Sequence, residues 1–331
     1  MKVLAQDRAD LIEALEAEAD LGRITTALLE KDEHLTDALR AMFALEFECV
    51  KLVFCGGTSL SKAHGLIERM SEDADLKMVL TEAGQMLSRT KLRRYLGDEV
   101  RVRVGHALLE LGLVEEVEKA ASLNEHRYMH SQWMYQRSYP VSEGLRPNLQ
   151  IELTLRPPVL PVEDTSLSAL SDSLAKRPGS TFIVPTVSVA ETQAEKVLSF
   201  LRRFAQHRAG EMLRPWDTAL VRHIYDVHCI FSRAPELMNI SAPAFSQLLR
   251  GDVAEFGRQH PDFAKDPLGV LESALGQVGA DEQSRTEYEQ NLLPLVYGSF
   301  KPPFEEAFAS FEKVARAFLD AAAVQSPSSL P

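Results

Sequence analysis

The sequence predicts an α+β protein, with a small mixed sheet flanked by helices and a helical C-terminal domain. Short segments that alternate apolar and polar residues, typical of strands, lie between residues 49 and 155. Before them, and again after Pro185, apolar residues recur at helical spacing. A chain of 331 residues is also long for one core. We therefore expect N-terminal helices packing on the core over 1–46, the core over 47–185, a helical domain over 186–325 and a frayed tail over 326–331.

The composition is typical of a globular protein rather than a disordered one. The formal net charge is −12, with 45% hydrophobic and 25% charged residues. The three cysteines lack the spacing of a disulfide framework, and the chain begins without an apolar signal segment. No apolar run is long enough to span a membrane. We expect a cytoplasmic protein with no membrane partner, whose acidic balance still leaves room for a local basic site.

The first elements are expected to be helices followed by a buried strand. Residues 8–46 carry leucines near helical spacing among many charges, and Gly22 separates two helices there. Residues 49–55 are short, apolar and partly β-branched, and they end at Gly56 and Gly57. This pattern predicts a strand that runs into a tight turn.

The glycine turn is the first candidate ligand site. Gly56 and Gly57 let a ligand approach the backbone, and amides at a helix N-terminus bind anions. Thr58 or Ser59 can cap the following helix, their hydroxyls can bind phosphate, and Lys62 lies one turn on. An ordinary strand-to-helix turn has the same residues, so the turn alone leaves both interpretations open.

The next strand, over residues 73–80, carries a pair of acidic residues. Asp73 and Asp75 are two residues apart, so both carboxylates point to the same face, opposite Ala74 and Leu76. Two such carboxylates repel each other unless a cation neutralises them, and hard oxygen ligands suit Mg²⁺. A solvated acidic face is the alternative, which the apolar opposite face and the glycine turn upstream disfavour.

The remaining core elements follow in order. We expect helices over residues 86–121, a long strand over 126–139 and a strand over 149–155. The Ser-rich segment over 165–180 predicts a loop with one short helix. Glu152 lies on the polar face of its strand, and three carboxylates on neighbouring strands can hold two metal ions.

Together these motifs resemble the polymerase-β-like nucleotidyltransferase superfamily. More narrowly, they are similar to the AbiEii/AbiGii nucleotidyltransferase toxins, which include the MenT toxins. That family has Gly-Gly-Thr-x-Leu followed by Lys, and then Ser-x-Asp-x-Asp. The matching residues here are Gly56, Gly57, Thr58, Leu60, Lys62, Ser71, Asp73 and Asp75.

Two later motifs extend the resemblance to about residues 45–232. A helical lysine matches Lys196, and an Arg-x-x-x-Asp helix matches Arg222 and Asp226. Lys196 lies opposite an apolar stripe, so an ordinary solvated lysine is the alternative. Arg222 and Asp226 are one turn apart, so a surface ion pair is the alternative for them. The segment between Lys196 and Asp226 is longer than the family pattern predicts, which bears on the Asp226 assignment.

The resemblance implies a Mg²⁺-dependent enzyme that transfers a nucleoside monophosphate from a nucleoside triphosphate (NTP) and releases pyrophosphate. The turn residues and Arg222 would bind the nucleotide, while Lys62 and Lys196 would neutralise its phosphates. The metal ligands would be Asp73, Asp75 and Glu152, with Ser71, Lys196 and Asp226 as further catalytic residues. Asp226 would orient Lys196 or Arg222, or contact the base. The helical domain would complete the active site.

The resemblance also implies a toxin of a type IV, phage-defence-like toxin–antitoxin system. Its acceptor would be the 3′ end of tRNA, which blocks translation, and its partner a cognate antitoxin. An acidic chain must concentrate its cations to bind RNA. Two stretches offer such cations, although both can equally be solvated helix faces: Arg89, Lys91, Arg93, Arg94, Arg101 and Arg103, and Arg202, Arg203, Arg208 and Arg214.

Two rival functions remain open from the sequence. An enzyme of the same fold can modify a protein or a small molecule, in which case activity needs no RNA. A non-catalytic interaction protein can keep the fold, although the presence of Asp73, Asp75 and Lys196 argues against it. A phosphate-binding P-loop and a dinucleotide fingerprint are both missing from the sequence.

Overall fold

The computed structural model of the chain describes residues 1–18, 21, 24–71, 73–140, 145–177, 179–212 and 215–325. The chain forms two compact units: Met1–Gly65 with Arg69–Val187, and Leu66–Glu68 with Ser188–Pro331. The predicted break at Gly22, the frayed tail and Arg214 fall outside the described residues. Within the described ranges, no helix is both long and apolar enough to cross a membrane.

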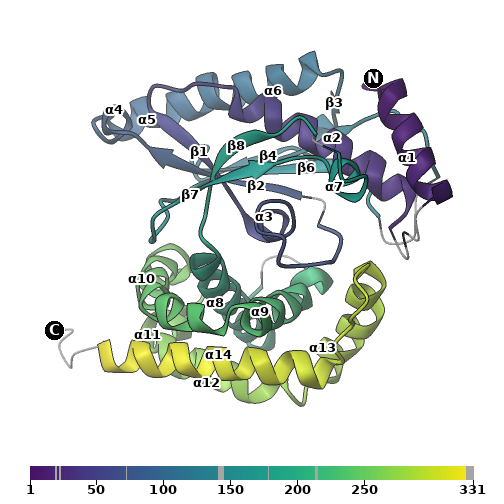
Figure 1. Ribbon diagram of the computed structural model, residues 1–331. Helices are drawn as coiled ribbons and strands as arrows, with labels where there is room; N and C mark the ends of the chain where they lie inside the picture. The colour runs from purple at the N-terminus through teal and green to yellow at the C-terminus, as the bar shows by residue number, and fades with distance from the viewer. Residues whose placement is uncertain are drawn as a thin grey trace. The chain divides into compact units, whose positions relative to one another are not determined.

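The first unit is built on a mixed sheet of eight strands (Figure 1). The strands are β1 (Val50–Cys55), β2 (Asp73–Leu80), β3 (Val114–Glu115), β4 (Ala121–Leu123), β5 (Tyr128–Met134), β6 (Asn148–Leu155), β7 (Glu163–Leu167) and β8 (Phe182–Thr186). Their order is β3-β5-β6-β2-β1-β8-β7, and β4 pairs with β5. Only β2–β6 and β1–β8 are parallel among these pairs. The predicted mixed sheet flanked by helices is confirmed.

Helices cover the sheet on both faces. They are α1 (Gln6–Glu18), α2 (Thr26–Phe43), α3 (Gly56–Lys62), α4 (Glu82–Gln85), α5 (Arg89–Tyr95), α6 (Arg101–Glu110) and α7 (Leu170–Leu174), with a π-helix η1 (Leu96–Val100) and a 3₁₀ turn η2 (Val117–Lys119). Figure 1 shows α2 and α6 over one face and α3 against the other.

The apolar core lies between the sheet and the helices α2, α5 and α6. Ala74, Leu76 and Met78 of β2 are at most 1% exposed and pack there with residues of those helices. Since side chains alternate along a strand, Asp73 and Asp75 point to the other face, as the pattern predicted. The strand bounds of β2 also agree with the predicted range 73–80.

Three predictions about local structure are wrong. The helical segment expected up to residue 121 ends at Glu110, because Gly112 adopts φ +84° and the chain turns into β3. The segment over 165–180, expected to be a loop with one short helix, does contain the short helix α7, but its first residues belong to β7, which lacks a clear alternation of apolar residues. The third concerns the cap of α3: the helix begins at Gly56, so Thr58 and Ser59 lie inside it and cap nothing.

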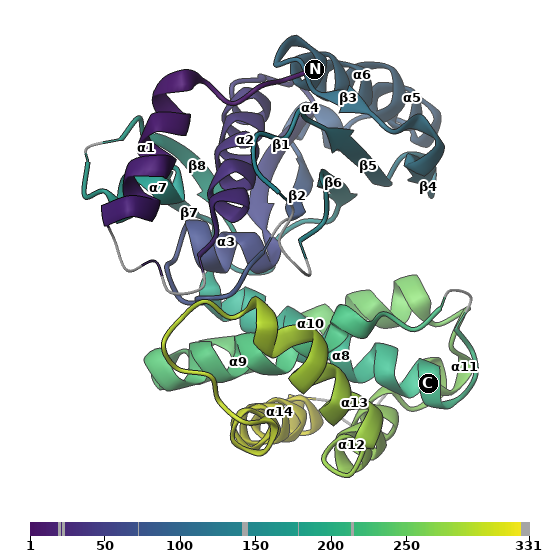
Figure 2. The ribbon, with the colours of Figure 1, turned by 90° about the vertical axis from the view of Figure 1, so that its right-hand side faces the viewer.

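The second unit is helical, as expected after Pro185. Its helices are α8 (Val189–Arg208), α9 (Arg222–Arg233), α10 (Met238–Phe256), α11 (Pro261–Lys265), α12 (Pro267–Val278), α13 (Glu282–Glu287) and α14 (Phe304–Gln325). The short turns between them are η3 (Thr218–Val221), η4 (Pro235–Leu237), η5 (Tyr288–Leu292) and η6 (Leu293–Leu295). Helix α8 packs on α9, α10 and α12, and α14 packs on α9 and α10 (Figure 2).

One buried histidine in α2 makes the first unit sensitive to acid. His34 is 1% exposed, neither ring nitrogen has a hydrogen-bond partner, and its ring lies 4.3 Å from that of Tyr135. Burial, with a smaller contribution from the charge of Lys2, lowers the pKa of His34 to about 4. The ring is therefore neutral in the folded protein at pH 7, whereas an unfolded histidine titrates near its ordinary pKa.

We predict that replacing His34 by Phe reduces the loss of stability in acid. The unfolded chain takes up the proton first, so the stability due to the neutral ring is complete above pH 6.5 and is lost as the pH falls toward 4. Between pH 7 and pH 5 the wild type should lose about 2 kcal/mol more than His34→Phe. Urea unfolding at both pH values measures this, and an equal loss in the two proteins would contradict it.

Candidate active site

The turn between β1 and α3 is packed against an acidic side chain. Gly56 has φ +79°, a conformation that favours glycine, and a β-carbon there would overlap the carboxylate of Asp75. A β-carbon at Gly57 would lie 2.8 Å from Nη2 of Arg69 and 3.0 Å from Oγ of Ser71. The two glycines are therefore required because polar side chains lie directly on the backbone of the turn.

The register of three strands aligns the candidate carboxylates. Cys55, the last residue of β1, is opposite Asp75 of β2, and Asp75 is opposite Glu152 of β6. Opposed residues on adjacent strands point to the same face, and adjacent strands are about 5 Å apart. Asp75 and Glu152 are thus neighbours on the face against which the glycine turn packs.

Asp73 has a cationic partner that sequence reasoning missed. Nη1 of Arg146 lies 3.0 Å and 3.3 Å from the two carboxylate oxygens of Asp73, and it also donates to Oε1 of Gln150 at 2.6 Å. Gln150 is in turn opposite Asp73 in the β2–β6 register. Arg146 lies just before β6 and belongs to no recognised motif, so its contact with Asp73 could be found only from the fold. There it neutralises part of the negative charge of the acidic pair.

The hydroxyl groups of the turn are engaged with the protein. Thr58 and Ser59 are fully buried. The Thr58 hydroxyl bonds to Oγ of Ser71 at 2.9 Å and donates to the carbonyl of Asp73, and the Ser59 hydroxyl donates to the carbonyl of Gly56 at 2.9 Å. In this structure the two hydroxyls hold the turn and the start of β2 together, and their binding of phosphate stays a prediction.

Lys62 also has a protein partner. Its ammonium lies 2.6 Å from Oδ1 of Asp32 in α2, and its side chain is only 6% exposed. The sequence predicted that Lys62 faces phosphate groups, and in this structure it pairs with a half-buried carboxylate. Asp32 was not among the predicted site residues because it lies in a helix far upstream.

The donor set suits a divalent cation that shares its ligands with a substrate. Among the described residues, no three acidic, histidine or cysteine side chains converge closely enough to hold a metal by themselves. Mg²⁺ is usually held by one or two carboxylates together with substrate phosphates. Asp73 and Asp75 fit that pattern, because they share one face of β2 beside the glycine turn. Glu152 as a third ligand stays a prediction.

In the second unit, the structure brings two of the predicted residues together. Nζ of Lys196 in α8 lies 2.6 Å from Oδ2 of Asp226 in α9, with the two side chains 8% and 0% exposed. Lys196 is therefore buried, although the helical pattern placed it away from the apolar stripe, because α9 covers that side of α8. Asp226 thus pairs across two helices, and Arg222, one turn before it in α9, is half-buried.

A histidine missed by the sequence reasoning adjoins this ion pair. Nδ1 of His223 lies 3.1 Å from the carbonyl oxygen of Lys196. Burial, and next the nearby charge of Lys196, lower the pKa of His223 to about 3. The imidazole is neutral at pH 7, so Lys196 keeps Asp226 as its counter-ion without competition from a second cation at His223.

Comparison with known proteins gives one family match. The sequence profile described as "Nucleotidyl transferase AbiEii toxin, Type IV TA system" matches residues 37–310. No curated protein matches the chain significantly.

Solved structures give distant similarities. The chain is 22% identical to MenT4, a nucleotidyltransferase toxin from Mycobacterium tuberculosis, over 76% of this chain and 72% of that one, with a TM-score of 0.43. It is 15% identical to JHP933 from Helicobacter pylori over 88% of this chain and 94% of that one, with a TM-score of 0.39.

We predict that Gly56→Ala damages the site more than a strained glycine alone explains. Gly65 is the matched control, because it has φ +61° but open space where a β-carbon would lie. Gly65→Ala should cost about 1–2 kcal/mol of unfolding free energy through backbone strain. Gly56→Ala adds the overlap with Asp75 and should lower nucleotide transfer on the order of a hundredfold. Equal activity of the two variants in a transfer assay would contradict this.

Proposed function

The chain belongs to the AbiEii family of nucleotidyl transferase toxins of type IV toxin–antitoxin systems, and from this premise we propose that it adds nucleotides to the 3′ end of tRNA in a Mg²⁺-dependent reaction and so inhibits translation. Nucleotidyl transfer by a family member requires an NTP substrate, and membership of a toxin–antitoxin family implies an antitoxin partner.

One observation carries the proposal: the Gly56 backbone lies directly against the Asp75 carboxylate, with Glu152 as the next residue across the sheet. Backbone amides at a glycine turn favour anions, and a carboxylate pair favours cations. A nucleoside triphosphate with its metal ion has both charges in one ligand. The contact between turn and acid strand is what such a ligand requires.

We assign the roles accordingly. Gly56 and Gly57 bind the β- and γ-phosphates through their backbone amides, and Asp73 and Asp75 hold Mg²⁺. The bound ion supplies charge neutralisation at the phosphates. For Asp73 to take part, the ion has to share its carboxylate with Arg146 or displace the guanidinium. Thr58 and Ser59 shape the turn through their hydroxyl hydrogen bonds. Further roles follow the family resemblance: Ser71 lies beside the nucleotide, Lys196 neutralises phosphate charge, Asp226 orients Lys196, and Arg222 contacts the nucleotide.

The transfer step is a displacement at phosphorus. A hydroxyl oxygen of the acceptor forms a bond to the α-phosphorus, while the bond from that phosphorus to the oxygen bridging to the β-phosphate breaks. Pyrophosphate leaves with the electron pair of that bond, and Glu152 accepts the proton of the hydroxyl. The contribution of the chain is mainly positioning and stabilisation of charge.

A basic surface in the first unit supports an RNA acceptor. The cations of α8 are paired within the second unit: Arg202 with Asp252, Arg203 with Asp217 and Arg208 with Asp281. Those that surround Glu125 in the first unit are exposed. We call them the α5 basic surface, which consists of Arg89, Arg93 and Arg127. RNA affinity depends on such clustered cations rather than on net charge.

The cations of the α5 basic surface act together on one acid. The pKa of Glu125 is lowered by a hydrogen bond from Arg89, at 2.9 Å, and by the charges of Arg93 and Arg127. Gly97 of η1 packs on the ring of His126, which joins the helical segment to the turn before β5. The excess of cations over this single carboxylate leaves positive charge for phosphate groups.

We predict that the protein transfers label from an NTP, labelled at the α-phosphate, to total tRNA in the presence of Mg²⁺. Each of the four NTPs is tested, and 3′-end analysis locates the added nucleotide. Asp75→Asn removes a charge that holds the metal, so it should lower transfer at least about a hundredfold. If label appears in a protein or a small molecule but in no RNA, that molecule is the acceptor and tRNA is not. No transfer from any NTP to any acceptor would refute the proposal.

A second prediction concerns the α5 basic surface. Replacing Arg93 and Arg127 by Ala should weaken tRNA binding and reduce the slope of log affinity against log salt by about 0.7 to 0.9 for each lost phosphate contact. Binding of NTP should not change. The control, Arg258→Ala with Arg316→Ala, removes two exposed charges from the second unit. An equal salt slope in both double variants, measured by filter binding, would contradict this surface.

A further inference from the structure

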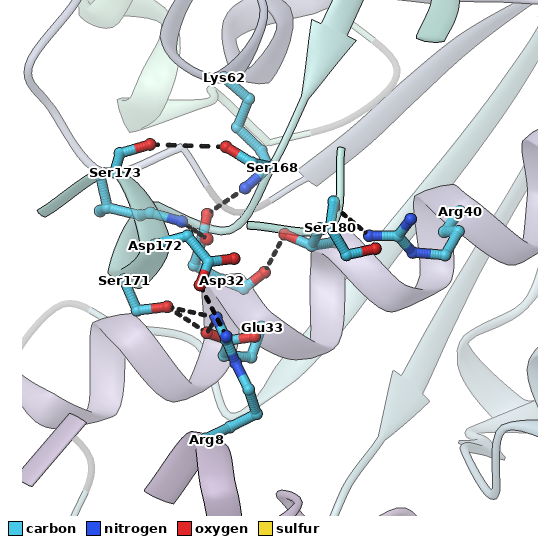
Figure 3. Close-up of polar contacts among 12 residues, drawn as sticks. Arg8, Asp32, Glu33, Arg40, Lys62, Ser168, Ser171, Asp172, Ser173 and Ser180 are labelled. Carbon is cyan, nitrogen blue, oxygen red and sulfur yellow. Dashed lines mark hydrogen bonds and ion pairs between the residues drawn. The ribbon is translucent and has the colours of Figure 1, made fainter. Parts of the chain in front are cut away.

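Helix α3 is held at both ends by charged or polar groups. It has only seven residues, Gly56–Lys62, and its first residues form the turn that lies on Asp75 and Ser71. Its last residue, Lys62, is tied to Asp32 of α2 (Figure 3). Because the helix is short, a movement of its last turn displaces the glycine turn as well.

Asp32 uses both carboxylate oxygens in this arrangement. Oδ1 accepts from Nζ of Lys62 at 2.6 Å, and Oδ2 accepts from the backbone N–H of Leu170 at 2.6 Å. Leu170 is the first residue of α7. The side chains of Lys62 and Asp32 are 6% and 14% exposed, so water screens their attraction weakly. One carboxylate therefore connects α2, α3 and α7.

The next residue of α2 makes a separate polar network. Glu33 accepts hydrogen bonds from Arg8 of α1 and from the Ser171 hydroxyl, and Arg8 also lies 2.7 Å from Oδ1 of Asp172 (Figure 3). This network joins α1, α2 and α7, and the hydrogen bonds and ion pairs that form it among the described residues do not include α3. Asp32 and Glu33 are thus neighbouring acids of α2, and each bonds to other helices. Asp32, through its ion pair with Lys62, is the one of the two that is linked to the glycine turn.

We propose that Asp32 is a positioning residue for nucleotidyl transfer, and that Lys62 acts through this ion pair rather than by touching the nucleotide. Turning the Lys62 ammonium toward phosphate would leave the Asp32 carboxylate with a single donor in a largely buried place. The pair fixes the distance between α2 and α3 and so the position of the turn amides. The proposal rests on nucleotide binding at this turn, one part of the proposed function.

The experiment uses the full chain and four variants: Asp32→Asn, Lys62→Gln, the double variant of both, and Glu33→Gln as the matched control. For each, we measure the Kd of each NTP with Mg²⁺, the kcat of label transfer to total tRNA, and the thermal midpoint. Rates are compared per folded protein, well below each midpoint.

If the pair positions α3, Asp32→Asn and Lys62→Gln should each lower kcat by a similar factor, on the order of ten- to a hundredfold. The double variant should be no worse than the poorer single one, because both changes break one interaction. Glu33→Gln should lower the thermal midpoint and leave kcat unchanged. That contrast separates positioning from general loosening of the first unit.

Two results would overturn the proposal. If Lys62 binds phosphate, Lys62→Gln weakens NTP binding while Asp32→Asn leaves it unchanged or tightens it. If stability alone matters, Glu33→Gln lowers kcat as much as Asp32→Asn. If Asp32→Asn does not fold, the rate at which Lys62 of the wild type is acylated decides between the two roles. NTP should leave this acylation rate unchanged. A slower acylation of Lys62 in the presence of NTP would refute the proposal. If the wild type binds NTP but transfers no label to tRNA, only the proposed acceptor is contradicted. The Kd values of the variants for NTP still test the role of the Asp32–Lys62 ion pair.

Discussion

The register between β1, β2 and β6 decides where the charged groups of the first unit meet. Asp75 lies between Cys55 and Glu152, so the end of the strand that carries the glycine turn is level with both acids. The burial of Ala74 and Leu76 fixes which face Asp75 uses, because a shift by one residue would exchange the two faces. The apolar core and the carboxylate arrangement therefore depend on one constraint.

The features that could be predicted from the sequence are local ones. A strand ending in Gly56, a pair of acids two residues apart and an alternating β6 all have their signal within a few neighbouring residues. The mixed sheet and the helical C-terminal part followed from such signals. Strands β7 and β8 were missed because their own residues lack a clear alternation of apolar and polar side chains. They are held in the sheet by the pairing of β7 with β8 and of β8 with β1.

The partners of the charged residues could not be predicted, since they come from distant segments. Arg146 reaches Asp73, Asp32 reaches Lys62, and Lys196 reaches Asp226 across two helices. Two lysines that a motif suggested for phosphate are thus held by carboxylates in buried or nearly buried places. Folding decides which cations of an acidic chain remain exposed.

The guanidinium of Arg146 on Asp73 competes with any other cation for that carboxylate. Where a divalent ion displaces the arginine, part of its attraction to Asp73 offsets the loss of the arginine contact. When no ion is bound, the same contact reduces the electrostatic repulsion between the carboxylates of Asp73 and Asp75. Apparent metal affinity at this place is then a difference between two competing interactions, and a nucleotide that attracts Arg146 would strengthen the binding of the ion through mutual coupling.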